Sequence, residues 1–463
     1  MQLPLSDCAR FFDQLKLPAP LDEATSMLMD EIKSRIRYLN DVGLGYLTLD
    51  RQSRTLSGGE VQRINLTTAL GTSLVNTLFV LDEPSIGLHP RDIDRVIGVL
   101  HRLRNAGNSL LVVEHDPQII LAADKVIDMG PGPGSHGGEV VFFGNTKKLA
   151  TSKKSLTANY LSRKNTLQRR DTGSSVNTKH TITLKGAGEH NLKNIDVEFP
   201  LQQLVCVTGV SGSGKSTLVQ DTLYRALCRH KGKPTEVAGT HQSVSGHQHI
   251  DDVVMVDQSP IGKSARSNPV SYTGAFDGIR KLFAEDPEAK QRNYTASSFS
   301  FNSGMRCPAC SGNGFEHVEM QFLSDVYLRC HACNGSRYRD EVLDIKLIHP
   351  QSGQAANISD VLNMTVDDAV NFFGEHKEVL KALTPLIDVG LGYLTLGQPV
   401  PTLSGGESQR LKLAAYLAKA KKKSKSESEK KLFLFDEPTT GLHFDDIKKL
   451  LFAFDQLLSL IHI

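Results

Sequence analysis

The sequence predicts an α/β fold made of two related halves, the second of which is interrupted by a smaller α+β domain. Three observations predict it: an internal repeat, a glycine-rich loop between a predicted strand and a predicted helix, and two Cys-x-x-Cys pairs inside the second half. The chain has 463 residues, which corresponds to about three domains at roughly 150 residues each. Hydrophobic residues make up 39% of the chain and charged residues 22%, which excludes a wholly disordered protein.

Composition and charge exclude further classes. The 53 basic and 51 acidic side chains give a net charge of +2, so any nucleic-acid surface must be a local patch. The longest apolar runs, such as Leu110–Val113 and Leu432–Phe435, fall far short of the ~20 residues that a membrane span needs. The N-terminus lacks the layout of a secretion signal. Seven cysteines, four of them in two pairs, favour a reducing cytoplasm and one metal site over a disulfide framework.

Three segments occur twice in the same order, so the chain contains two homologous halves. The segments DVGLGYLTL and LSGGE each recur 347 residues later, and LDEPSIGLH recurs as FDEPTTGLH after 354 residues. They are Asp41–Leu49 with Asp388–Leu396, Leu56–Glu60 with Leu403–Glu407, and Leu81–His89 with Phe435–His443. The seven extra residues fall in the lysine-rich segment Ala418–Lys431, which we expect to be a surface loop.

A glycine-rich loop follows a short apolar run in the second half. Leu204–Thr208 is β-prone, GVSGSGKST follows, and the next ten residues have helical spacing. The loop fits G-x-x-x-x-G-K-[ST] in the strand–loop–helix context that this motif requires. Its glycines let backbone N–H groups surround a phosphate. We expect Lys215 to reach the β- and γ-phosphates and Ser216 to ligate Mg²⁺. The predicted nucleotide-binding residues here are Gly209, Ser211, Gly212, Ser213, Gly214, Lys215, Ser216 and Thr217.

Two apolar runs, Leu78–Leu81 and Leu432–Phe435, each end in Asp-Glu-Pro. A buried parallel strand that delivers carboxylates at its C-terminal end is typical of a nucleotide site. We expect Asp436 to hold Mg²⁺ and Glu437 to orient and polarise the attacking water.

The first half carries counterparts of these carboxylates in Asp82 and Glu83. A further apolar run there ends near His115, which is placed to contact a γ-phosphate, with a purely structural histidine as the alternative. The second-half counterpart of His115 would fall at position 469, beyond the last residue.

A Ser-Gly-Gly sequence precedes a predicted helix in each half, at Ser57, Gly58 and Gly59 and again at Ser404, Gly405 and Gly406. Such a helix start offers N–H donors to an anion, whereas a single copy could be an ordinary helix cap. Together with the Asp-Glu-Pro strands, the set resembles the ATP-binding-cassette (ABC) ATPases, in which this motif of one half closes over the nucleotide held by the other. The resemblance implies one composite site formed by Gly209–Thr217, Gln258, Asp436, Glu437 and Ser57–Gly59. No second phosphate loop occurs between Met1 and Leu56.

The two Cys-x-x-Cys pairs, with 19 residues between them, predict a closed tetrahedral Zn²⁺ site. The predicted ligands are Cys307, Cys310, Cys330 and Cys333. Four thiolates leave no open position, so the zinc is not expected to be catalytic. A basic rim favours a DNA contact over scaffolding alone; its residues are Arg306, Arg329, Arg337, Tyr338 and Arg339.

A zinc module between the phosphate loop and the second LSGGE narrows the resemblance. From Leu21 to Gln456 the chain is similar to the UvrA family of the bacterial nucleotide excision repair excinuclease, in motifs that include DEPSIGLH, GPGPGSHGGEVV, DQSPIGKSARSNP and FNSGMRCPAC. The resemblance implies tandem ABC-type cassettes that work as a homodimeric, ATP-hydrolysing and cytoplasmic protein. It also implies that the protein recognises damaged double-stranded DNA through backbone and deformability and loads the second component of the excinuclease, UvrB.

We expect six segments along the chain. They are the C-terminal part of the first cassette (1–150), a basic linker (151–180), the start of the second cassette (181–260), the inserted zinc domain (261–385), the rest of the second cassette (386–457) and a non-native tail (458–463). A nucleic-acid contact is the alternative for the linker. The last six residues depart from the family pattern and back-translate to the start of a common transposon-end sequencing adapter.

Two other functions fit the same motifs. One is a paralogous tandem-cassette ATPase for drug self-resistance, which shares every motif found here. The other is a DNA-binding fragment without turnover, because one of the two composite sites lacks its phosphate loop within this sequence.

Overall fold

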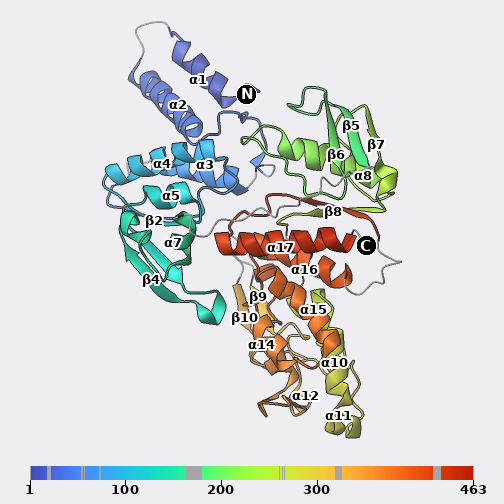
Figure 1. The fold of residues 1–463 in the computed structure, drawn as a ribbon. Helices are drawn as coiled ribbons and strands as arrows, with labels where there is room; N and C mark the ends of the chain where they lie inside the picture. Colours follow the sequence, from blue (N-terminus) through green and yellow to red (C-terminus); the bar gives the residue numbers. More distant parts are fainter. Residues whose placement is uncertain are drawn as a thin grey trace.

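The computed structural model describes residues 2–17, 22–53, 56, 58–71, 75–162, 180–259, 261–262, 264, 266–318, 326–420 and 429–461. It is a mixed α/β structure (Figure 1) in which the first half, drawn in blue and cyan, lies beside the second half, drawn in green and red. The insertion of the second half, in yellow and orange, extends away from both as an arm. No helix in the described ranges combines the length and hydrophobicity that a membrane span requires.

The first half alternates helices with short strands. Its helices are α1 (Leu5–Gln14), α2 (Glu23–Asp41), α3 (Gly58–Gly71), α4 (Pro90–Asn105), α5 (Pro117–Ala122), α6 (Thr146–Leu149) and α7 (Leu156–Leu161), with a 3₁₀ turn η2 (Gly134–His136). Its strands are β1 (Leu78–Asp82), β2 (Ser109–Val113), β3 (Val126–Gly130) and β4 (Glu139–Gly144). β1 and β2 pair in parallel and β3 and β4 antiparallel, so the Asp82 end of β1 and the Val113 end of β2 lie at one edge.

The second cassette consists of an antiparallel lobe and a parallel strand pair. The lobe has strands in the order β6–β5–β7, which are β5 (Thr181–Ala187), β6 (Ile195–Pro200) and β7 (Ser243–Ser245). With them lie η3 (Thr217–Tyr224), α8 (Arg225–His230) and η4 (His247–His249). The parallel pair is β8 (Asp252–Val256) with β13 (Lys431–Phe435), flanked by η5 (Val400–Thr402), α16 (Gly405–Ala420) and α17 (Phe444–Ile461).

The insertion is mainly helical, with two small antiparallel ribbons. Its helices are α9 (Pro269–Tyr272), α10 (Ala275–Glu285), α11 (Pro287–Gln291), α12 (Asp340–Leu343), α13 (Ile358–Asn363), α14 (Val366–Phe372) and α15 (Lys377–Asp388). Its ribbons pair β9 (Phe315–Val318) with β10 (Val326–Arg329) and β11 (Leu347–Ile348) with β12 (Ala355–Ala356). Local sequence explains several of these boundaries: the Asn357 side chain accepts from Asp360 N at the start of α13, and the Asp360 side chain accepts from Asn357 N in return.

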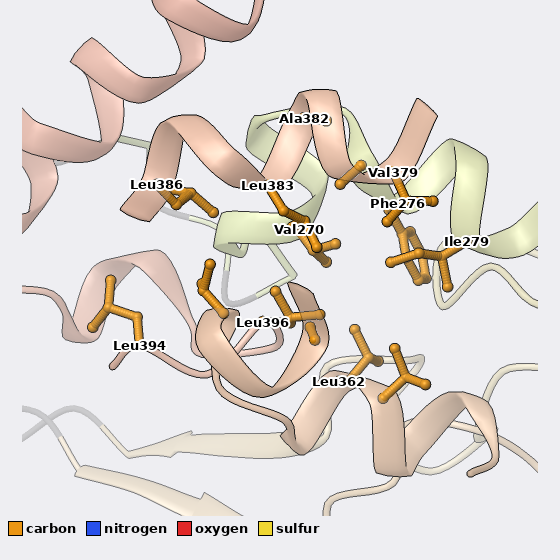
Figure 2. Close-up of a cluster of buried hydrophobic side chains, with 14 of the residues drawn as sticks. Val270, Phe276, Ile279, Leu362, Val379, Ala382, Leu383, Leu386, Leu394 and Leu396 are labelled. Carbon is orange, nitrogen blue, oxygen red and sulfur yellow. The ribbon is translucent and has the colours of Figure 1, made fainter. Parts of the chain in front are cut away.

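The largest hydrophobic core joins the insertion to the second cassette. Leu383 and Leu386 of α15 pack with Val270 and with Leu394 and Leu396 of the repeated GYLTL segment (Figure 2). The same cluster continues to α16 and α17. Because this core is continuous, the helix that follows the second Ser-Gly-Gly is anchored in the packing of the insertion. The predicted segment boundaries themselves stay a prediction.

One local prediction was wrong. Leu204–Thr208, predicted as a strand, has no ladder partner among the described strands. In the first half β1 pairs with β2, whereas among the described strands β13 pairs with β8. The helix after the phosphate loop begins with wide π-helical turns in η3 and becomes α-helical only from Arg225.

Candidate nucleotide and zinc sites

The phosphate loop encloses the side chain of its own lysine. Lys215 Nζ donates to the carbonyl oxygens of Gly209 at 2.9 Å and of Val210 at 3.2 Å. Gly214 has φ +101°, and a Cβ there would lie 2.9 Å from Asn191 Oδ1, so this position of the motif admits only glycine without rearrangement. The loop leads through Ser216 into η3. This geometry suits the phosphate-binding role of Gly209–Thr217, which stays a prediction.

The second-half carboxylates lie within the electrostatic influence of this lysine. Desolvation raises the pKa of Asp436, and the charge of Asp257 raises it further, while Lys215 acts in the opposite direction. Desolvation also raises the pKa of Glu437, with Asp436 adding to the effect and Lys215 and Arg63 opposing it. The positive charge of Lys215 thus acts on two carboxylates at a strand end, a combination that suits phosphate and Mg²⁺ binding.

Gln258 and the second-half glycines surround the same strand end. Gln258 Nε2 lies 3.4 Å from the carbonyl oxygen of Glu437. A Cβ on Gly405 would lie 3.2 Å from Gln258 Oε1. Ser404 and Glu407 form a capping box at the start of α16, because Ser404 N donates to Glu407 Oε2 at 2.8 Å and Glu407 N donates to Ser404 Oγ at 3.2 Å. The second Ser-Gly-Gly motif, which ends at Gly406, is therefore a helix start, as predicted.

The first-half Ser-Gly-Gly motif is described only in part. Ser57 lies outside the described residues, while Gly58 and Gly59 form the first turn of α3. The predicted approach of this turn to the phosphate loop stays a prediction. Other contacts nevertheless bring the first half against that loop.

The two halves touch through an equivalent pair of glycine turns. A Cβ on Gly87 of the first half would lie 3.2 Å from Glu437 Oε2 of the second half. A Cβ on Gly441 of the second half would lie 2.8 Å from Glu83 Oε2 of the first half. These residues share the 354-residue offset, so the halves pack with approximate two-fold symmetry. Ser211 of the phosphate loop also donates its hydroxyl to the carbonyl oxygen of Gly87 at 3.1 Å.

The first-half carboxylates have a histidine beside them rather than a lysine. His115 Nε2 lies 3.7 Å from Glu83 Oε1. Desolvation raises the pKa of Glu83, the histidine acts against this shift, and Asp82 reinforces it. Sequence reasoning missed His443, whose ring centroid lies 6.4 Å from that of His115 and whose Nε2 lies 3.2 Å from Thr157 Oγ1. Its position at the end of a repeated segment was the signal that could have identified it.

Sequence reasoning also missed the hydrogen bonds of three side chains, although these bonds involve repeated segments. Gln409 of α16 is buried and donates from Nε2 to the carbonyl oxygens of Val256 and Asp436, at 2.9 Å each. Tyr46 and Tyr393, in the repeated DVGLGYLTL segment, donate their hydroxyls at 2.6 Å to the glutamate of LSGGE in their own half.

The four predicted zinc ligands converge. The Sγ atoms of Cys307, Cys310, Cys330 and Cys333 all lie within 4.8 Å of one another. The β9–β10 ribbon separates the two pairs, and Cys330 N donates to Gly314 O at 3.0 Å across its base. Although desolvation works against it, backbone hydrogen bonds lower the pKa of the Cys330 thiol to about 7. Four converging thiol groups match the donor set of a structural zinc site.

The predicted basic rim is smaller than expected. Arg337 is only 3% exposed: its Nη2 donates to Gly397 O at 2.7 Å, and its guanidinium lies over the Phe301 ring. Tyr338 is buried and donates to Phe299 O at 2.8 Å. Both side chains anchor the cysteine loops to neighbouring parts of the chain, Tyr338 within the insertion and Arg337 to Gly397 of the second cassette. Arg329 and Arg339 remain exposed.

Comparison with known proteins places this geometry in a family. No family model matches the chain. UvrABC system protein A of Methanothermobacter thermautotrophicus is 50% identical over 99% of this chain and 46% of the relative. The Lactiplantibacillus plantarum protein of that name is 49% identical over 97% of this chain and 46% of the relative. The structure of UvrA2 from Deinococcus radiodurans superposes with a TM-score of 0.85, at 40% identity, over 100% of this chain and 55% of that chain.

The chain spans about half the length of the curated relatives that it matches. The match nevertheless includes both halves and the insertion, with tandem ABC-type cassettes as its fold. By this identity along almost its whole length, the chain belongs to the UvrA family.

Proposed function

We propose that this chain contributes the ATP-hydrolysing, damage-recognising part of a nucleotide excision repair protein, which binds damaged double-stranded DNA as a homodimer and loads UvrB. The names of its relatives support this assignment. The observation that carries it is the junction of the halves: the Gly87 turn of the first half packs on Glu437 of the second, whose pKa the charge of Lys215 also lowers. A site built from both halves can couple nucleotide chemistry to their relative movement.

The residues of the second half divide the chemistry between them. Lys215 would hold the β- and γ-phosphates, and Ser216 and Asp436 supply the oxygen donors that suit Mg²⁺. Bound Mg²⁺ supplies neutralisation of the charge on the phosphate oxygens. Glu437, whose Oε2 accepts from Thr440 Oγ1 at 3.3 Å, would orient the attacking water and take up its proton. Gln258 would line the same reaction path, and His115 would play the corresponding part beside Glu83 at the first-half carboxylates.

The zinc module would present DNA with a small basic surface. Bound Zn²⁺ supplies folding free energy to the loops that carry the cysteines. Arg329 and Arg339 are exposed near these loops, where they would contact phosphates rather than base edges. Recognition through the backbone suits lesions of diverse structure.

Nucleotide turnover and DNA binding by the same preparation test the proposal. We expect ATP hydrolysis that depends on Mg²⁺, and tighter binding to a duplex with one bulky adduct than to the undamaged duplex of the same sequence. Anisotropy of a labelled duplex at one stated salt concentration measures the second. Hydrolysis without any preference for the adduct would favour the self-resistance paralogue. DNA binding without hydrolysis would favour the fragment without turnover.

A further inference from the structure

The tyrosine of the repeated DVGLGYLTL segment touches both halves of the molecule. The ring of Tyr46 lies directly against Gly212 of the phosphate loop, where a Cβ would come within 3.1 Å of the ring atoms Cγ and Cδ2. Gly212 has φ +74°, and its carbonyl oxygen accepts from Asn191 Nδ2 at 2.9 Å. The phosphate loop is thus held on one side by its own half and on the other by a first-half aromatic ring.

The opposite end of Tyr46 reaches the LSGGE helix. Its hydroxyl donates at 2.6 Å to Oε1 of Glu60, which lies in the first turn of α3 and is only 6% exposed. A hydroxyl–carboxylate bond of this length is a strong, charge-assisted hydrogen bond. Desolvation, followed by the bond to Glu60, raises the pKa of Tyr46, so the phenol stays a donor at physiological pH.

The segment around Tyr46 is rigid enough to transmit a position. Val42, Leu44 and Leu47, which flank the tyrosine, are 1%, 0% and 5% exposed in the core of the first half. A Cβ on Gly45 would lie 2.5 Å from Asn40 Oδ1, so the backbone turns tightly at this point. The ring of Tyr46 is therefore held by a buried segment between the phosphate loop and Glu60.

From these contacts we propose that Tyr46 is a positioning residue that couples the phosphate loop of the second half to the LSGGE helix of the first. This inference rests on the proposed ATP site. When a triphosphate orders the phosphate loop, Tyr46 holds α3 in register with it, so the start of α3 can approach the γ-phosphate. A diphosphate needs only the phosphate loop, and its binding does not depend on the tyrosine.

The second half offers a matched control. Tyr393 donates to Glu407 Oε1 at the same 2.6 Å, and its flanking residues Val389, Leu391 and Leu394 are equally buried. Its contact across the halves is different, because it packs on Gly134 of the first half, where a Cβ would lie 2.7 Å from Tyr393 Cβ. Removing either hydroxyl breaks an equivalent bond, but of the two tyrosines Tyr46 is the one that touches the phosphate loop.

The test compares Tyr46→Phe with Tyr393→Phe in the whole chain. Binding of mant-ADP and of the non-hydrolysable mant-AMPPNP is measured with Mg²⁺ present. We expect Tyr46→Phe to lower the affinity for mant-AMPPNP relative to mant-ADP by about tenfold or more, the loss typical of a hydrogen bond to a charged group. Tyr393→Phe should leave that ratio within about twofold, and both variants should lose similar thermal stability, which separates positioning from a general structural effect.

Two more variants keep the outcome clear. Glu60→Gln retains an acceptor for the phenol and should preserve part of the AMPPNP preference, while Gly212→Ala should reduce it because the ring must move. Equal ratios for Tyr46→Phe and Tyr393→Phe, or a wild-type chain that binds both nucleotides equally well, would overturn the inference. A wild-type chain that binds neither nucleotide would instead contradict the proposed function.

Discussion

Replacing Gly87 by alanine should impair ATP turnover far more than it impairs folding. Gly87 has φ +67°, a conformation that costs an L-residue about 1–2 kcal/mol. Its new Cβ would lie 3.2 Å from Oε2 of Glu437, closer than ordinary van der Waals contact, and 3.5 Å from Oε1. The carboxylate must therefore move by a few tenths of an ångström or the two halves must separate. Since a 1 Å misplacement of a catalytic group can cost about a hundredfold in rate, we expect kcat to fall by about tenfold.

The repeat supplies the control for this prediction. Gly441 has φ +69°, and its Cβ would lie 2.8 Å from Glu83 Oε2, so Gly441→Ala introduces the same backbone strain and an even closer approach. Glu83, however, has His115 rather than the phosphate-loop lysine beside it. Thermal unfolding should show similar losses for the two variants, whereas steady-state ATPase assays should show a lower kcat only for Gly87→Ala. Equal kcat values for the two variants would refute the assignment of Glu437 to the working site.

Three other results are expected. Lys215→Ala removes the cation of the phosphate loop, whose charge acts on Asp436 and Glu437, and should weaken binding of ATP by about tenfold to a hundredfold. Equilibrium dialysis checks this, and unchanged binding would contradict the site. Cys307→Ser removes one of four converging thiols and should release the zinc while the cassettes stay folded. Metal content after dialysis measures the zinc, and circular dichroism measures the fold. Zinc that stays bound at one equivalent per chain would count against the site. The pKa of Glu437 is raised, and Glu437 must be ionised to act as a base, so kcat should rise with pH through a value above the usual ~4.3 for glutamate. Protonation is favoured in the folded state, so the stability that Glu437 contributes should be lost as pH rises through the same value. An acid limb of the kcat profile at or below pH 4 would argue against the role of Glu437.

Most residues of the candidate sites were predicted from short sequence motifs. Spacing alone indicated three features, because the residues of each motif are close in sequence. They are the phosphate loop, the two Asp-Glu-Pro strand ends and the two cysteine pairs. The converging cysteines match the pattern of the sequence. Arg337 shows the limit of this reasoning, because its position beside a cysteine pair predicted a rim, while its burial against Phe301 and Gly397 depends on segments 36 and 60 residues away.

By itself, the sequence determined that the chain has two related halves, a loop of the form G-x-x-x-x-G-K-[ST] and two Cys-x-x-Cys pairs, since each is written in local patterns and their repetition. The tertiary structure alone decided which residues of one half meet the other: Gly87 with Glu437, Gly441 with Glu83, and Tyr46 with Gly212. It also decided that Leu204–Thr208 is not a paired strand. The physical reason is the same in both cases, because hydrogen-bonded ladders and packing between halves depend on a partner segment that is distant in the chain, and no local spacing specifies that partner.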